Sequence, residues 1–463
     1  MLRKLRYYMA NYDYDVLYIG TGHAAWHGAL ILAQAGKKIA FAERDLTGGT
    51  CTNYGCDAKA LLDGPAELVS ALERYKDLGV SADIKMDWPK FMAYKHQSID
   101  PLAGAMTGML TGAGFTIIRG DASFVDDHTV KVGDQCVTAQ NIVICTGQYD
   151  FKLPIPGNEY MHTSREILDL PELPSHITFI GAGIISMEFA SLLTQFGVKA
   201  TVIEFADRAL LQYSEEYAAR VVAKLEEAGV DFHFGQSLSS IEKNGDKYLA
   251  KTEQGFCVET DYILAATGRR ANVEGLDLEK AGVEYSPRGI KVDDHMRTSK
   301  DNIYASGDVV DKMIPRLTPT ATFESNYIAL SILGSPAPIK YPAVPNVVFT
   351  LPRIAACGVS VNEALKNPDK YTVSKIKYGQ MMAFEYRNET DAEATVIFDK
   401  DKYLVGAELY GDLAAEMINV VTMIINGHMT MEMMMGTIWA FPTQVDGLTE
   451  MLAPMLHSDM AGA

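Results

Sequence analysis

The alternation of hydrophobic and polar positions near the start of the chain predicts a strand, a turn, a helix and a second strand. Tyr14 to Ile19 form an apolar, β-rich run. A helix is predicted from Trp26 to Ala35, because apolar residues recur at the i, i+3, i+4 and i+7 spacing of one face: Trp26, Ala29, Leu30 and Ala33. Lys38 to Ala42 form the second apolar run. We expect a β–α–β unit with this helix face buried.

The turn inside this unit has the G-x-G-x-x-A pattern of a dinucleotide-binding loop. Small residues occupy its three fixed positions: Gly20, Gly22 and Ala25. They allow backbone amides to approach a pyrophosphate at the helix N-terminus, and Glu43, at the end of the second strand, can accept from ribose hydroxyls. His23 and His27 border the turn. We interpret them as residues of the first helical turn, with a place near phosphate as the alternative.

The same pattern occurs a second time in the middle of the chain. Gly181 and Gly183 form the turn, Ser186 takes the third position and Glu204 ends the next strand. The interval from first glycine to acid is 23 residues in both copies, so we predict two bound dinucleotides. A carboxylate at Glu204 would repel the 2′-phosphate of NADPH and favours NADH, while Arg208 leaves NADPH possible.

Three further apolar runs end in residues that suit close approach of a ligand. "NIVICTG" ends in Thr146 and Gly147, and "DYILAATG" ends in Gly268. "DNIYASGD" ends in Gly307 and Asp308. From about residue 341 the chain alternates strand-like segments with a helical segment over 414–427 and a methionine-rich stretch, which predicts a separate α+β domain.

The composition is that of a globular protein with several domains. The 463 residues are 48% hydrophobic and 22% charged. The net charge of -18 disfavours nucleic acid and anionic membranes as partners. No apolar run reaches the length of about 20 residues that crosses a bilayer. The opening "MLRKLRYYMA" lacks the apolar core of a signal peptide, so we predict a cytoplasmic protein.

The segment "GGTCTNYGC" places Cys51 and Cys56 close together in a chain with six cysteines. In a reducing compartment such a pair is more often catalytic or metal-binding than structural. The other cysteines are scattered and no histidine is spaced to complete a zinc set, so we expect no metal. Helix positions five apart are about 140° out of phase. A disulfide would therefore need a distorted turn, which Gly55 allows. A helix N-terminus would also lower the pKa of the thiols.

Together these segments resemble the flavoprotein disulfide reductases, which include glutathione reductase, dihydrolipoamide dehydrogenase and mercuric reductase. "GGTCTNYGC" resembles their redox motif, "IYASGDV" their flavin-binding motif and "VVFTLPRIAACG" the start of their dimerisation domain. The resemblance implies an α/β fold with two Rossmann-like domains and a C-terminal α+β dimerisation domain. It also implies FAD in the first site, NADH in the second with NADPH possible, and a homodimer.

The resemblance further implies domain bounds and residue roles. FAD would bind to residues 1–150 and 271–338, NAD(P)H to 151–270, and 339–463 would form the dimerisation domain. Cys56 would lie against the flavin, and Cys51 would exchange with a small-molecule or protein disulfide, or with another electrophilic acceptor. Lys59, paired with Glu188, would lie near the flavin N5, and Asp308 would bind the ribityl chain. Other cofactor contacts are expected from Gly49, Thr50, Thr146, Gly147, Gly268 and Gly307.

The chain departs from the family pattern at its C-terminal motif, where the family's His-Pro-Thr-x-x-Glu crosses the dimer interface. Here Phe441 replaces the acid–base histidine and Asp446 the glutamate. A positioned acid contributes about 10²–10⁴-fold, so we expect slow disulfide turnover. Mercuric reductase also lacks the histidine, but its C-terminal cysteine pair is missing here. A mercuric-ion or quinone reductase, or a redox sensor, remains the alternative. The methionines of 429–435 are expected to pack rather than carry metal.

Overall fold

The computed structural model describes residues 12–458. The chain divides into two compact units, of which the first comprises Met1–Ala58, His96–Tyr149 and Arg269–Lys340, and the second Lys59–Lys95, Asp150–Gly268 and Tyr341–Ala463. The basic opening segment, on which the prediction of a chain without a signal peptide rests, lies outside the described residues. Among the described helices none is both long enough and apolar enough to traverse a bilayer.

The first unit is built on a seven-stranded sheet with the order β3-β2-β1-β6-β5-β4, in which β19 also pairs with β6. Its strands are β1 (Tyr14–Ile19), β2 (Ile39–Glu43), β3 (Thr116–Arg119), β4 (Ala122–Phe124), β5 (Thr129–Val132), β6 (Gln135–Ile144) and β19 (Ile303–Ala305). Strands β3, β2, β1, β6 and β19 are parallel to one another, whereas β5 pairs antiparallel with β6 and β4 pairs antiparallel with β5. The predicted first strand is confirmed with the same bounds.

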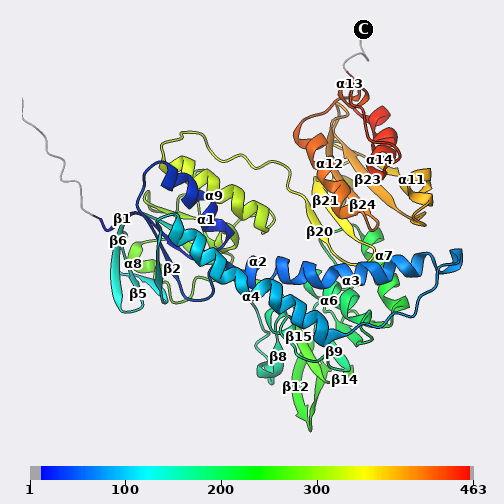
Figure 1. Cartoon of the computed structure of the whole chain (residues 1–463), viewed down its shortest axis with the longest axis horizontal. Coiled ribbons are helices and arrows are strands. Elements are labelled where there is room, and N and C mark those ends of the chain that lie inside the picture. Colours follow the sequence, from blue (N-terminus) through cyan, green and yellow to red (C-terminus); the bar gives the residue numbers. More distant parts are fainter. Residues whose placement is uncertain (1–11, 459–463) are drawn as a thin grey trace, which may run out of the picture. The chain divides into compact units, whose positions relative to one another are not determined.

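Helix α1 (His23–Gln34) lies against α9 (Thr318–Ile332) (Figure 1). Its buried face matches the predicted one only in part. Ala29 is buried as predicted, whereas Trp26, Leu30 and Ala33 are half-buried against the core. The other buried positions are Ala24, Ala25, Gly28 and Leu32. A Cβ on Gly28 would stand 2.2 Å from the Ser325 carbonyl oxygen of α9, and the Gly28 N–H donates to Ser325 Oγ at 2.9 Å. Only small side chains permit this approach, and Trp26 is half-buried against the core of the same unit.

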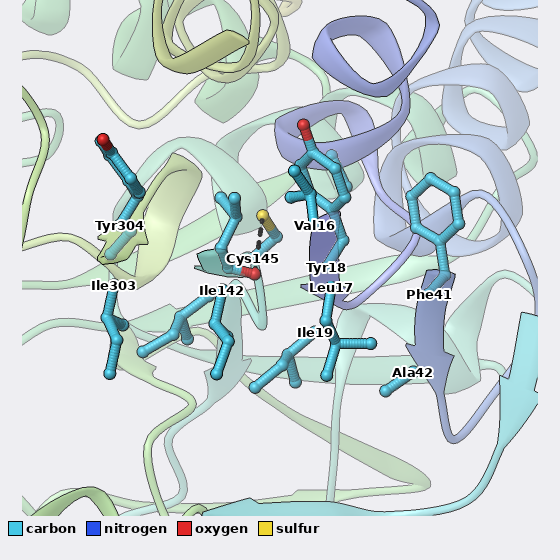
Figure 2. Close-up of a cluster of buried hydrophobic side chains, with 14 of the residues drawn as sticks. Val16, Leu17, Tyr18, Ile19, Phe41, Ala42, Ile142, Cys145, Ile303 and Tyr304 are labelled. Carbon is cyan, nitrogen blue, oxygen red and sulfur yellow. Dashed lines mark hydrogen bonds between the residues drawn. The ribbon is translucent and has the colours of Figure 1, made fainter. Parts of the chain in front are cut away.

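The core of the first unit is made by the inner residues of four neighbouring strands. Figure 2 shows side chains of β1, β2, β6 and β19 gathered around this core. Tyr18 and Phe41 stack with ring centroids 5.3 Å apart, and Cys145 is buried just after β6. Close packing of these buried side chains holds the carboxyl ends of the strands in fixed positions, and in open α/β sheets ligands bind at these ends.

The second unit contains a parallel sheet with the order β11-β10-β9-β15-β8. Its strands are β8 (Met161–His162), β9 (His176–Ile180), β10 (Lys199–Ile203), β11 (Val230–His233) and β15 (Tyr262–Ala265). The strand order β11-β10-β9-β15 repeats the order β3-β2-β1-β6 of the first unit, as expected of a second Rossmann-like domain. Helices α6 (Ile184–Thr194) and α7 (Glu215–Glu227) follow β9 and β10, and an antiparallel sheet is formed by β12 (Leu238–Asn244), β13 (Lys247–Thr252) and β14 (Cys257–Thr260).

The C-terminal part of this unit is an antiparallel sheet with helices, in the order β20-β21-β24-β23-β22. Its elements are β20 (Asn346–Val348), β21 (Ile354–Gly358), α10 (Val361–Lys366), β22 (Thr372–Ile376), α11 (Met382–Glu385), β23 (Glu393–Phe398), β24 (Leu404–Tyr410), α12 (Ala414–Asn426), α13 (Met431–Met435) and α14 (Gln444–Leu452). The predicted α+β domain is confirmed. Strand β24 was not predicted, because Gly406 and the buried Glu408 interrupt its apolar pattern.

Candidate redox-active site

Cys51 and Cys56 lie on two helices separated by a single residue. Cys51 belongs to α2 (Gly49–Tyr54), and α3 (Cys56–Arg74) begins at Cys56. A Cβ on Gly55 would stand 3.0 Å from the Thr50 carbonyl oxygen, so a side chain at this break would crowd the backbone of α2. The break allows the Cys51 thiol to hydrogen-bond to the Cys56 sulfur. The predicted distortion is thus confirmed, and it brings the two sulfurs into contact.

The proton of Cys51 is held more tightly than the sequence suggested. Its hydrogen bond to Cys56 and its burial raise the pKa of the Cys51 thiol, and a hydrogen bond from Thr318 offsets this only in part. The prediction of a lowered pKa is therefore wrong for Cys51, because the neighbouring sulfur outweighs the helix terminus. Thr318 Oγ1 also lies 3.7 Å from Cys56 Sγ. Thr318 is the first residue of α9 and was not among the site residues predicted from the sequence.

The first glycine turn is joined to the cysteine segment by hydrogen bonds. The N–H and the hydroxyl of Thr21 both donate to Glu43 Oε2, at 3.0 and 2.5 Å. The Asp45 N–H donates to the other oxygen of Glu43 at 2.8 Å. The Gly48 N–H donates to Thr21 Oγ1 at 3.1 Å. Thr21 therefore connects the acid of the dinucleotide turn with the segment that carries Cys51.

The start of α1 forms a cradle that side chains would fill. Gly20 has φ +109°, and a Cβ there would stand 2.6 Å from the Cys145 carbonyl oxygen. A Cβ on Gly49 would lie 2.8 Å from Gly22 Cα, and one on Gly307 would lie 2.7 Å from the Ala24 Cβ. The N-cap of α1 is Gly22, whose position has no side-chain cap. An uncapped helix start lined by glycines fits the diphosphate of FAD.

The segment with Gly307 and Asp308 is held by a buried acid on α9. The Gly307 N–H donates to Glu324 Oε2 at 2.7 Å, and the other oxygen of Glu324 pairs with the buried ammonium of Lys312. Arg316 Nε donates to the Asp308 carbonyl oxygen at 3.2 Å. Asp308 is half-buried. Sequence reasoning selected Gly307 and Asp308 but missed the residues that hold them, since these follow no local motif.

Thr146 and Gly147 are anchored to one residue of the same unit. Thr146 Oγ1 donates to the Asn272 carbonyl oxygen at 2.7 Å, and the Asn272 N–H donates to the Gly147 carbonyl oxygen at 2.9 Å. Thr50 is exposed beside Cys51. The cofactor contacts expected of Thr50, Thr146 and Gly147 stay predictions.

The second glycine turn repeats the geometry of the first. Gly181 has φ +97°, and a Cβ there would stand 2.6 Å from the Ala266 carbonyl oxygen. The N–H groups of Ala182 and Ala206 donate to the two oxygens of Glu204, at 2.5 and 2.8 Å. The N-cap of α6 is Gly183, again without a side-chain cap. This helix start fits the diphosphate of a pyridine nucleotide for the same physical reason.

Arg208 is engaged by the backbone near this second turn. Its guanidinium donates to the carbonyl oxygens of four residues at 3.1 to 3.3 Å: Ala209, Leu210, Leu211 and Tyr213. Arg208 would have to give up these bonds before its guanidinium could clamp a phosphate. Gly268 is also a predicted cofactor contact of this unit. It has φ +102° and open space where a Cβ would lie.

Lys59 forms an ion pair with Glu188 in the second unit. Lys59 Nζ donates to Glu188 Oε2 at 2.9 Å and lies 3.7 Å from the centroid of the Phe349 ring. The Phe349 N–H donates to Glu188 Oε1 at 2.8 Å. Burial raises the pKa of the Glu188 carboxyl, and Lys59 and the Phe349 amide oppose that shift. The expected pair is present, and Lys59 is not a solvated surface lysine.

The segment around Phe441 is exposed and apolar. Phe441 is 84% exposed and Ile438 is 99% exposed. Thr443 caps α14 by accepting from the Asp446 N–H at 3.2 Å. Of the neighbouring methionines, Met434 is buried and Met435 is exposed, so the methionine stretch packs only in part. An exposed apolar segment of this kind is typical of an interaction surface.

Two Rossmann-like sheets with acid-anchored glycine turns and a contacting thiol pair define a flavin- and pyridine-nucleotide-dependent oxidoreductase. The chain belongs to the pyridine nucleotide-disulphide oxidoreductase family, which it matches over residues 14–325, and it carries the dimerisation domain of that family over residues 344–452. It is thus an oxidoreductase that acts on sulfur groups and uses FAD and NAD(H).

Curated relatives and solved structures agree with this assignment. The chain is 32% identical over 442 residues to a dihydrolipoyl dehydrogenase of Bacillus subtilis, with 93% of each chain covered. It is also 32% identical to the dihydrolipoyl dehydrogenase of Chlamydia pneumoniae, with 93% and 94% covered. A Cu(II) complex of the HOCl-induced flavoprotein disulfide reductase RclA from Escherichia coli matches with a TM-score of 0.86 and 25% identity, covering 96% of this chain and all of that one.

Proposed function

We propose that the chain passes electrons from NADH, through FAD, to Cys51 and Cys56 and on to a disulfide or another electrophilic acceptor. The observation that carries this proposal is the contact of the two sulfurs across the break at Gly55. Bound FAD would supply two-electron transfer between the nicotinamide and the cysteine pair. The glycine turn at Gly20 would hold FAD, and the turn at Gly181 would hold NADH.

The two cysteines have different tasks in the proposed reaction. The Cys51 thiol loses its proton, and its sulfur attacks the acceptor disulfide to form a mixed disulfide and release one thiolate. The Cys56 thiolate then attacks the Cys51 sulfur, closes the Cys51–Cys56 disulfide and releases the second thiolate. Each thiolate takes up one proton. The sum is one disulfide, one NADH and one proton converted to two thiols and NAD⁺.

The polar residues around the glycine turns position groups rather than react. Glu43 and Glu204 would accept from ribose hydroxyls while each stays bonded to its own turn. Asp308, held beside Gly307, would accept from the ribityl chain. Lys59, fixed by Glu188 and the Phe349 ring, would place a positive charge beside the flavin. The same proposal assigns FAD to residues 1–150 and 271–338 and NADH to 151–270.

Residues 339–463 would pair two copies of the chain as a homodimer. The dimerisation domain of the family supports this proposal, and so does the exposed apolar segment with Ile438 and Phe441. The family motif would bring Phe441 to the partner's site, where no imidazole is available at this position.

A metal-ion or quinone reductase is the second candidate. It is favoured by Phe441, which cannot protonate a departing thiolate, whereas Cu(II) and quinones leave no thiolate behind. The Escherichia coli structures that resemble this fold include Cu(II) complexes.

An acceptor panel with NADH as the donor tests the proposed function. We expect the enzyme to reduce lipoamide or glutathione disulfide. The turnover rate should be about 10²–10⁴-fold lower than that of an enzyme with a positioned acid in place of Phe441. Consumption of NADH is followed with each disulfide, with a benzoquinone and with Cu(II). Turnover of the quinone or Cu(II) without any disulfide turnover would replace the leading proposal with the second candidate. No turnover with any acceptor would contradict both.

We expect the enzyme to prefer NADH to NADPH by at least about tenfold in kcat/KM, or about 1.4 kcal/mol. The buried Glu204 carboxylate would face the 2′-phosphate, and Arg208 is occupied by carbonyl groups. Steady-state rates with both nucleotides measure the ratio. Glu204→Gln removes the charge and keeps the size of the side chain, so it should reduce the preference for NADH over NADPH. Equal efficiencies in the unmodified enzyme would refute the assignment.

A further inference from the structure

Two histidines outside the proposed redox chemistry contact each other at the start of α1. His23 and His27 lie one helical turn apart, and His23 Nδ1 is 3.1 Å from His27 Nε2. Both side chains are half-buried. Neither is needed by the glycine cradle, which uses backbone atoms. The pair is therefore a cluster of two imidazoles without a task in the proposed reaction.

The rings of this pair are held by stacking. The His27 ring lies on the Trp26 indole, with centroids 3.4 Å apart and an interplanar angle of 26°. The His23 ring packs against the same indole at 5.5 Å. Because the indole restricts both imidazoles, little side-chain entropy remains to be lost when they bind a ligand together.

The distance between the two nitrogens matches the bite of a metal ion. Metal–imidazole bonds of about 2.0–2.1 Å place two nitrogens about 2.9 Å apart at a right angle and about 3.4 Å apart at a tetrahedral angle. The observed 3.1 Å lies between these values. Burial lowers the pKa of both imidazoles, that of His27 to about 4, so both are neutral near pH 7, as metal binding requires.

We propose that His23 and His27 form a binding site for a divalent transition-metal ion, with Cu(II) preferred. Imidazole nitrogens suit Cu(II), and for a given site affinity rises along the series to copper and falls again at zinc. Within residues 12–458, no three His, Cys, Asp or Glu side chains lie close enough together to hold one metal ion. Water would therefore complete the coordination of an ion bound by the two histidines. The negative charge of Asp57 acts on His23 and favours a cation there.

This inference is independent of the acceptor. It concerns binding only, and a disulfide reductase or a quinone reductase could carry the same site. Its failure would leave the cysteine chemistry untouched, and failure of the cysteine chemistry would leave the histidine site untouched.

Copper titration of the FAD-loaded protein tests the site. The experiment uses protein in which Cys51, Cys56 and the exposed Cys136 and Cys257 are all replaced by serine, because accessible free thiols would bind copper and reduce Cu(II) to a species without an EPR signal. We expect one Cu(II) with nitrogen couplings from two imidazoles. Loss of an outer-shell partner of a metal site weakens binding by about 10–100-fold. His27→Ala removes a direct ligand and should weaken copper binding by more than that. His27→Asn should weaken copper binding as much, although it keeps a polar side chain of similar shape.

His96→Ala is the matched control, because His96 is another helical histidine of the same unit with Asp100 one turn away. It should leave the copper affinity and the EPR spectrum unchanged. FAD content and thermal unfolding of each variant establish that the fold is retained. The proposal is overturned if the parent protein shows no imidazole-coupled Cu(II), or if His96→Ala weakens binding as much as the His27 variants do.

Discussion

Replacement of Cys56 by serine is expected to abolish NADH-dependent turnover of disulfides, with a loss of at least about 10³-fold in kcat. A serine hydroxyl cannot close a disulfide with Cys51, so a mixed disulfide formed on Cys51 has no internal route to resolution. The measurement is steady-state NADH oxidation with a disulfide acceptor. FAD content and thermal unfolding show whether the variant folds.

Cys136→Ser serves as the control, because Cys136 is an exposed thiol on β6 of the same unit. It should keep normal turnover. Thiol alkylation of the wild type before and after reduction by NADH should gain label at Cys51 and Cys56 and at no other cysteine. Turnover of Cys56→Ser within tenfold of the wild type would show that this pair does not carry the electrons.

Introducing the missing imidazole should accelerate disulfide turnover. Phe441→His is expected to raise kcat with lipoamide or glutathione disulfide by up to about 10²-fold, the lower end of the range for a positioned acid. The full range is not expected, because Asp446 is shorter than the glutamate that orients the family's histidine. Steady-state rates at several pH values measure the effect, and a new ionisation near the ordinary histidine pKa of about 6.5 should appear.

Phe441→Leu shows whether a faster Phe441→His variant gains from the added proton donor or from the removal of the aromatic ring. It removes the aromatic ring without adding an acid, so its disulfide turnover should stay near the wild-type value. An equal rise in Phe441→Leu and Phe441→His would mean that the ring obstructs the acceptor. Unchanged turnover in Phe441→His would mean that thiolate protonation does not limit this enzyme.

The sequence alone determined the parts of this protein whose geometry is local. A glycine turn between a strand and a helix fixes its own shape, so Gly20 with Glu43 and Gly181 with Glu204 could be paired from spacing. The break at Gly55 could likewise be predicted, since two cysteines five positions apart cannot meet across a regular helix. The pairing of Lys59 with Glu188, 129 residues apart, came from the family resemblance instead.

Only the tertiary structure decided the features that depend on distant segments. The buried face of α1 was predicted only in part, because α9, about 300 residues further along, requires a small residue at Gly28. Thr318 reaches Cys56 across 262 residues, and Glu324 holds Gly307 from another helix. Such contacts leave no periodic or spaced signal in the chain, because packing and not sequence proximity brings the groups together.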